Sequence, residues 1–228
     1  TLMFSCSDDD SSSNGGNTIE AIASQNPNLS ILVDALDRAD LSLDRNGSFT
    51  VFAPTNDAFI QFLNDNDFES LNDVPVPVLR EVLLNHMVIG VNMSSNLTTG
   101  YVKTLAKGSA SSTNTLSMFV NTASGVRLNG VANVVAADVM ASNGVVHVVD
   151  AVIGLPTIVT HALANPNFTR LVGALTSEGQ PDFVGILSGT ANSPFTVFAP
   201  SNDAFATFES QNPGTIASLT PSQLTAVL

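Results

Sequence analysis

The sequence contains nearly the same segment twice, and this duplication restricts what the chain can fold into. FTVFAPTNDAF spans Phe49–Phe59 and FTVFAPSNDAF spans Phe195–Phe205, with Thr55 replaced by Ser201 as the one change. A second matched pair of segments lies earlier in each copy: NPNLSILVDAL precedes the first FTVFAP segment, and NPNFTRLVGAL precedes the second. Because order is kept across several segments, the pattern predicts a duplicated domain rather than a short motif used at two sites.

The duplication divides the chain into three expected parts. Residues 1–17 are expected to form a signal remnant and flexible linker, residues 18–155 a complete domain, and residues 156–228 the N-terminal part of a second domain. The second copy has no counterpart of Asn85 to Leu155. We therefore expect the second of the two tandem copies to be truncated.

Within the complete copy, the apolar spacing changes from helical to strand-like. NPNLSILVDAL has apolar residues at helical intervals, whereas residues 49–53 form a short buried strand closed by Pro54. Thr55 is the expected N-cap of the next helix, and Asp57 lies in its first turn, where the helix dipole favours a negative charge. After Met87 the sequence changes to strand-like runs: YVKTLA, TLSMFVN, VRLNG, ANVVAADV and GVVHVVDAVIG. Helices followed by strands predict an α+β domain.

Charge and cysteine content limit the partners and the location of the protein. A formal net charge of −13, from 7 basic and 20 acidic residues, repels phosphate backbones and anionic lipids, so no nucleic-acid partner is expected. The one cysteine, Cys6, follows a short apolar stretch and precedes an acidic run, as in bacterial surface lipoproteins. We therefore expect Cys6 to be lipidated and membrane contact to occur only through this anchor. The alternative is a free thiol in a disordered tail.

Three ordered motifs make the chain resemble a known family. TVFAPTNDAF, LLNHMV and NGVVHVVDAVIGLP are similar to the two boxes and the intervening histidine motif of the fasciclin (FAS1) domain family. The resemblance covers residues 18–155 completely and 156–228 in part. It implies a wedge of two β-sheets with helices packed alongside, in which Thr50–Phe59 and Gly144–Val152 lie side by side. One departure is Asn85, since adhesive animal members have tyrosine before the histidine.

The resemblance also implies a function and a location. Family members are mostly extracellular or anchored at the cell surface, often carry tandem domains, and are mostly associated with adhesion or matrix binding. We therefore expect a non-enzymatic adhesion or polymer-binding module at a bacterial cell surface, with a cell-surface or matrix protein or a glycan as partner. The alternative is a small apolar ligand such as a carotenoid or lipid, in a cavity lined by Phe49, Phe52, Phe59, Phe62, Met118 and Phe119.

The polar residues give few candidates for chemistry. His86 lies on the apolar stripe of its helix, which predicts a buried, hydrogen-bonded histidine with Asp57 as a partner; the alternative is a recognition site at Asp57, Asn85 and His86. His147 and Asp150 are expected on opposite faces of a strand, and His161 on the surface. The sequence has no nucleophile elbow and no HExxH motif, so no catalytic residue, metal or cofactor is expected.

Overall fold

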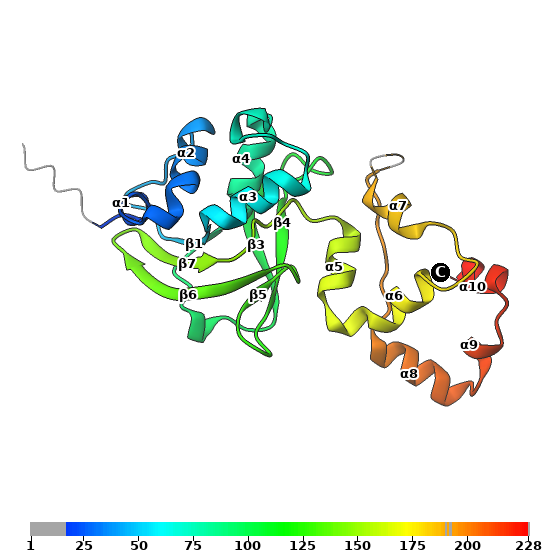
Figure 1. Cartoon of the computed structure of the whole chain (residues 1–228). Helices are drawn as coiled ribbons and strands as arrows, with labels where there is room; N and C mark the ends of the chain where they lie inside the picture. Colours follow the sequence, from blue (N-terminus) through cyan, green and yellow to red (C-terminus); the bar gives the residue numbers. More distant parts are fainter. Residues whose placement is uncertain (1–16, 190, 192, 228) are drawn as a thin grey trace, which may run out of the picture.

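The computed structural model describes residues 17–189, 191 and 193–227 (Figure 1). Cys6 lies outside the described residues. We call residues 18–155 the first repeat and residues 156–228 the second repeat. The helices of the first repeat are α1 (Ile19–Gln25), η1 (Pro27–Leu29), α2 (Ser30–Arg38), α3 (Asn56–Asp65) and α4 (Val76–Asn85), with short 3-10 turns η2 (Leu71–Asp73) and η3 (Ser94–Asn96). Its strands are β1 (Phe49–Pro54), β2 (Met87–Ile89), β3 (Gly100–Lys107), β4 (Thr115–Asn121), β5 (Arg127–Leu128), β6 (Ala132–Ala141) and β7 (Gly144–Val149).

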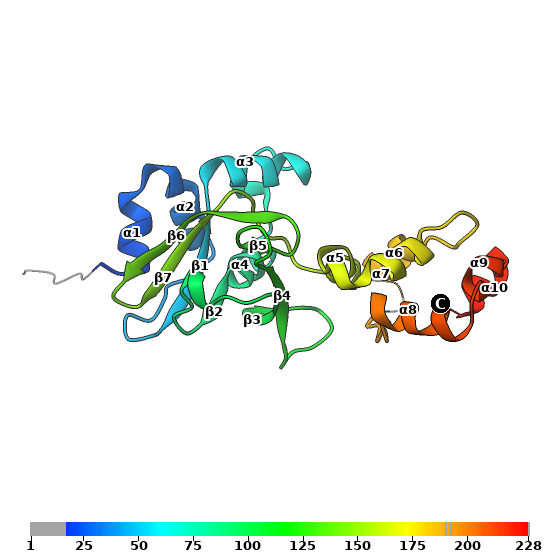
Figure 2. The ribbon, with the colours of Figure 1, turned by 90° about the horizontal axis from the view of Figure 1, so that it is seen from below.

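The seven strands follow one another in the order β2-β1-β7-β6-β5-β4-β3. Strands β1 and β7 pair in parallel, and the other neighbours are antiparallel. Strand β6 links two parts of this arrangement, because its first two residues pair with β5 while Val134 to Ala141 pair with β7 across two register shifts. The two parts face different directions in Figure 2, which gives the expected α+β wedge. Thr50 to Pro54 and the β7 residues are adjacent, as expected.

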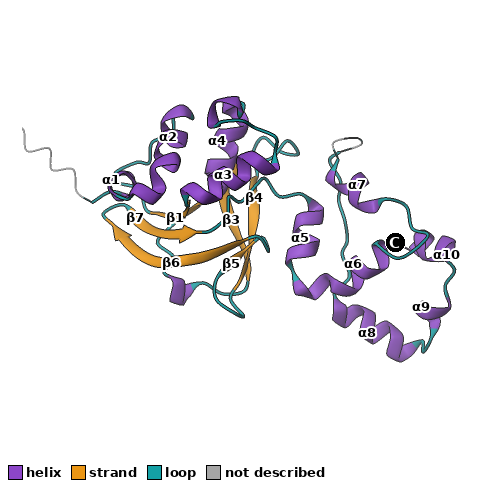
Figure 3. Cartoon of the chain, viewed as in Figure 1, coloured by secondary structure: helices purple, strands orange, loops and turns teal. Residues whose placement is uncertain are grey.

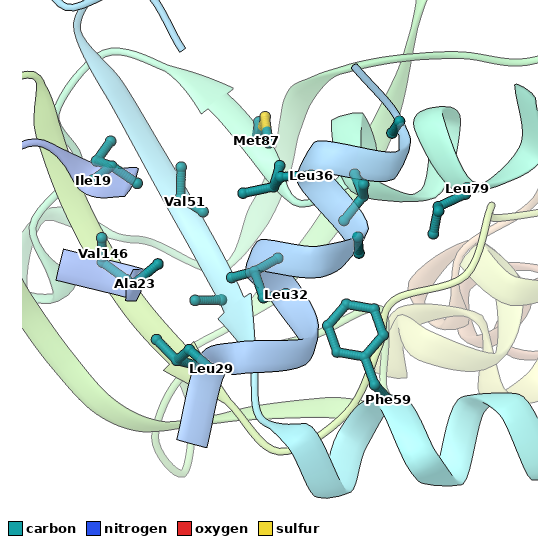
Figure 4. Close-up of a cluster of buried hydrophobic side chains, with 14 of the residues drawn as sticks. Ile19, Ala23, Leu29, Leu32, Leu36, Val51, Phe59, Leu79, Met87 and Val146 are labelled. Carbon is teal, nitrogen blue, oxygen red and sulfur yellow. The ribbon is translucent and has the colours of Figure 1, made fainter. Parts of the chain in front are cut away.

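The core of the first repeat has two layers that share β1. Figure 3 shows α1 to α4 gathered along one side of the strands, and Figure 4 shows the apolar side chains between them, including Leu32, Val51 and Val146. On the other side of β1, Phe52 packs with Met118 and Val149 between the two parts of the sheet. Strand β1 is buried on both faces, which explains why its sequence is a continuous apolar run.

The second repeat reproduces the helices but not the strand. Its elements are α5 (Ile158–Ala164), η4 (Pro166–Phe168), α6 (Thr169–Leu175), α7 (Phe183–Ser188), α8 (Asn202–Gln211), α9 (Thr215–Ser218) and α10 (Pro221–Val227). Residues 195–200, whose letters match β1, have no strand assignment. Phe198 is 92% exposed, whereas its counterpart Phe52 is 1% exposed. Within the part of the chain that the structure describes, no strand pairs with this segment.

Among the described residues, no helix has the length and apolar character needed to cross a bilayer.

Gly144 is the tightest point of the parallel pairing and supports a prediction about stability. Its φ is +151°, and an added Cβ would lie 1.9 Å from the carbonyl oxygen of Phe49. We expect Gly144→Ala to lower the free energy of unfolding by more than about 3 kcal/mol, because the clash is with backbone and cannot be relieved by a rotamer change. Chemical denaturation followed by circular dichroism measures this loss.

Gly100→Ala is the matched control. Gly100 also lies on a strand, but an added Cβ there meets no atom within 4 Å. This control is expected to change stability by about 0.5 kcal/mol or less. Similar losses of unfolding free energy in the two variants would contradict the view that close contact between β1 and β7 requires glycine at position 144.

Candidate functional site

The candidate site from the sequence lies where α4 ends against the segment that follows β7. His86 is the C-cap residue of α4 and is 2% exposed. Its Nδ1 lies 2.7 Å from the carbonyl oxygen of Val82, and its Nε2 accepts a hydrogen bond of 2.9 Å from the backbone N–H of Ile153. Since Nε2 is an acceptor, the proton of the neutral ring is on Nδ1, which donates to Val82. His86 is therefore buried and hydrogen-bonded, as the helical spacing predicted.

The surroundings of His86 keep the ring neutral. Burial lowers the pKa of His86 from 6.5 to about 4, although the hydrogen bond with Val82 acts in the opposite direction. A second proton on Nε2 would also replace the lone pair that accepts from Ile153. The ring thus serves as a fixed link between helix α4 and the chain beyond β7.

Asn85 makes a second link to the same segment. It has no exposed surface, and its Nδ2 donates to the carbonyl oxygens of Ile153 at 3.3 Å and Gly154 at 3.0 Å. Its Oδ1 is buried without a partner among the described residues. The pair Asn85 and His86 therefore faces inward and holds residues 153–154, so neither side chain is accessible to a partner in this structure.

Asp57 does not belong to this site, and the expected pairing with His86 is wrong. Asp57 is exposed in the first turn of α3, and both ring nitrogens of His86 are occupied by backbone groups. The N-cap is Thr55, as expected, whose Oγ1 accepts from the N–H of Ala58 at 3.2 Å. The sequence placed Asp57 correctly on the helix but gave no information about which way its side chain points.

Asn56, the residue before Asp57, holds α3 against the helical segment that precedes β1, a role that the sequence did not predict. Asn56 Oδ1 accepts from the N–H of Ile31 at 3.0 Å, and its Nδ2 donates to the carbonyl of Pro27 at 2.9 Å and to Ser30 Oγ at 3.0 Å. Asn202 makes the same three bonds in the second repeat, to the backbone of Arg170 and Pro166 and to the Thr169 hydroxyl. The repeated asparagine after Thr55 and Ser201 was the available signal.

His147 is part of a separate buried network. Its Nδ1 accepts from the N–H of Asp138 at 3.1 Å, and its Nε2 lies 2.9 Å from the carbonyl of Asn92. The Asp138 carboxylate accepts from the N–H and hydroxyl of Ser94, and these bonds lower its pKa. Asp150 instead accepts from Asn133, so the expectation that His147 and Asp150 do not pair is confirmed.

His161 is not the surface residue that the sequence predicted. It lies on α5 with its ring centre 5.4 Å from that of Tyr101 on β3, in an edge-to-face arrangement. Burial lowers its pKa. Asn165 Nδ2 donates to Tyr101 Oη at 3.2 Å in the same contact. The contact joins two repeats, so the sequence of either repeat alone could not reveal it.

The side chains of the candidate site bind backbone groups of the chain itself. Within residues 17–227, apart from the positions left undescribed, no three His, Cys, Asp or Glu side chains gather as a metal site. Five of the six apolar residues expected around a ligand belong to two separate packed clusters. The enclosed void beside Phe52 and His86 measures about 10 Å³, which is about the space of one water molecule. The buried members of the set are Phe52, Phe59, Met118 and Phe119.

A larger apolar cavity, of about 250 Å³, lies in the second repeat. It is lined by Ile158, Leu171 and Val197 among others, which correspond to Ile19, Leu32 and Val51. In the first repeat these positions are covered by β2 and β7. The lining of this cavity therefore corresponds to core positions of the first repeat.

Comparison with known proteins decides the family. The model of the Fasciclin domain matches residues 27–156 and 166–228. The chain belongs to the Fasciclin domain family. Protein sll1483 of Synechocystis sp. is 40% identical over 138 residues, which are 60% of this chain and 72% of that protein. Human periostin is 28% identical over 166 residues, which are 72% of this chain and 18% of periostin.

One solved structure in the comparison is a FAS1 domain pair from the insect cell adhesion molecule fasciclin I. It shares 21% identity with a TM-score of 0.45, and the match covers 84% of this chain and 62% of that one.

The pKa of His86 leads to a pH prediction. The unfolded chain binds a proton at His86 below pH 6.5, whereas the folded chain does not until about pH 4. We expect the contribution of this group to the free energy of unfolding to be complete above pH 6.5 and to fall by about 3 kcal/mol by pH 4. Denaturant unfolding at a series of pH values measures it. His86→Gln removes this part of the slope, and equal slopes in the two proteins would contradict it.

Asn56 and Asp57 can be separated by paired substitutions. We expect Asn56→Ala to lower the free energy of unfolding by about 2 kcal/mol, because three hydrogen bonds that join α3 to η1 and the start of α2 are lost. Asp57→Ala removes only a charge near the helix N-terminus and is expected to cost about 0.5 kcal/mol. Thermal and denaturant unfolding distinguish the two, and a larger loss for Asp57→Ala would refute this assignment.

Proposed function

We propose that this protein is a non-enzymatic adhesion or matrix-binding module at the cell surface. The observation that carries the proposal is the match of the Fasciclin domain over two stretches that together span most of the chain. A related domain pair belongs to an insect cell adhesion molecule. The inward-facing Asn85 and His86 support a partner that binds the outer surface, since these side chains have no exposed polar atoms to offer.

The mechanism proposed is multivalent attachment. Two copies of one domain on a single tether raise the effective concentration of weak sites, so that modest affinities can hold a cell. The tether is proposed to be a lipid on Cys6 followed by the polar run of residues 7–17, which would place the protein at a bacterial cell surface. The partner is proposed to be a protein or glycan of a neighbouring cell or of the matrix.

An apolar small-molecule ligand is not favoured by the interior of the first repeat. The enclosed void in its core measures about 10 Å³, and of the side chains that were expected to line a cavity only Phe52 borders it. A drug-sized ligand occupies a pocket of about 300 Å³ or more. Binding through the exterior is therefore the function that the geometry supports best.

Cell retention on coated beads tests the proposal. Beads carry either the full chain or an unrelated protein of equal net charge, and retained host and neighbouring cells are counted. We expect several-fold higher retention by the full chain, falling more steeply than linearly as its density on the bead is reduced, because attachment is multivalent. Equal counts on the two kinds of bead at every density would overturn the proposal.

A further inference from the structure

A groove of about 500 Å³ lies on the first repeat, between α3, α4 and the segment that follows β7. It is formed by the second half of α3 and the turn after it, by α4, and by residues 150–155, which leave β7 toward α5 in Figure 1. Val78 and Leu155 are 43% and 37% exposed there. The apolar side chains of its lining include Phe62, Phe68, Val78, Val82, Val152 and Leu155.

The charged groups that line this groove are all acidic. They are Asp65 and Asp150, and the lining contains no Lys, Arg or His among the described residues. Asp65 is the last residue of α3, where the helix dipole is negative and where the last turn contains no basic residue. An acid at this end of a helix is unfavourable by itself, so a cation bound beside Asp65 would be favoured by the carboxylate and by the helix.

Local bonds hold both carboxylates in place. Asp65 Oδ1 accepts from the side chain of Gln61 at 2.6 Å. Asp150 accepts from the backbone and side-chain nitrogens of Asn133 at 2.7 and 2.9 Å. These donors are neutral, so the negative charge of each carboxylate is not compensated by them. Each ionised oxygen can accept more than one bond, which leaves sites for a cationic donor.

The second repeat shows that the fold does not require these groove residues. Phe62 and Val82 have the identical counterparts Phe208 and Val227. Asp65, in contrast, corresponds to Gln211, and Val78 corresponds to Gln223. The helices form in both repeats. The acid at the helix end and the exposed valine are therefore features of this groove rather than of the fold.

We propose that this groove binds an extended segment of a partner protein that presents lysine or arginine between apolar side chains. The aliphatic part of such a side chain can lie along Val78, Phe62 and Leu155 while its charge reaches Asp65 or Asp150. The net charge of −13 attracts basic segments toward the protein before contact. This inference rests on the proposed adhesive function and names the chemistry of the partner segment.

Fluorescence anisotropy of the full chain with a labelled peptide of alternating valine and lysine tests the proposal. We expect saturable binding that weakens with added salt and is lost when glutamate replaces lysine in the peptide. Asp65→Asn should weaken binding about two- to five-fold. Val78→Lys should weaken it at least tenfold, because it places in the groove a positive charge that repels the lysines of the peptide.

Two matched substitutions control for general electrostatics. Asp67→Asn and Val76→Lys make the same charge changes at exposed positions outside the lining, and Val76 is 40% exposed on the same helix as Val78. We expect binding to change less than twofold in both. Absent binding, equal binding of the glutamate peptide, or equal losses in the matched variants would overturn the groove assignment.

Repeating the bead experiment with these variants separates this inference from the proposed function. Lower cell retention by Asp65→Asn and Val78→Lys than by their controls is the expected result. Cells retained equally by wild type and by Val78→Lys would leave adhesion in place and reject the groove as its site. Specific peptide binding without any cell retention would reject adhesion while the groove still binds basic segments.

Discussion

The parallel pairing of β1 and β7 is the interaction on which the rest of the first repeat depends. It joins Phe49–Pro54 to Gly144–Val149, with backbone so close at its start that only glycine fits at position 144. The paired strands provide both faces of the core, one toward the helices and one toward the other part of the sheet. Because β7 ends beside Thr55, the chain that follows it must pass the start of α3 and reach the end of α4.

The histidine motif completes this arrangement. Asn85 and His86 bind the backbone of residues 153–154, and the backbone carbonyl of His86 accepts from the N–H of Phe52 on β1. Asn85 and His86, the candidate recognition residues, thus attach the last segment of the first repeat to the end of α4. That attachment also fixes one wall of the groove above α3 and α4, so the internal polar bonds shape an external surface. Adhesive contacts at such a surface need not involve the histidine itself.

The candidate site could be predicted from the sequence only where local spacing determines it. The apolar stripe around His86 indicated burial, and Thr55 was recognisable as a cap, because both follow from helix geometry. The partner of His86 was not predictable, since the N–H of Ile153 lies far along the chain. Asp57 does not bind His86, while Asn56 in the first repeat and Asn202 in the second each link two helices. His161 is covered by Tyr101 from the other repeat, a contact that neither repeat encodes locally.

The sequence by itself determined the duplication, the helices with their caps, the α+β class and the apolar character of the FTVFAP segment. Tertiary structure alone decided what that segment becomes. At residues 49–54 it is a buried strand, whereas at residues 195–200 the same letters form no strand and Phe198 is exposed. A helix satisfies its backbone hydrogen bonds within its own segment, but a strand needs partners from elsewhere in the chain. The first copy has β2 and β7 beside it, and those neighbours make the strand.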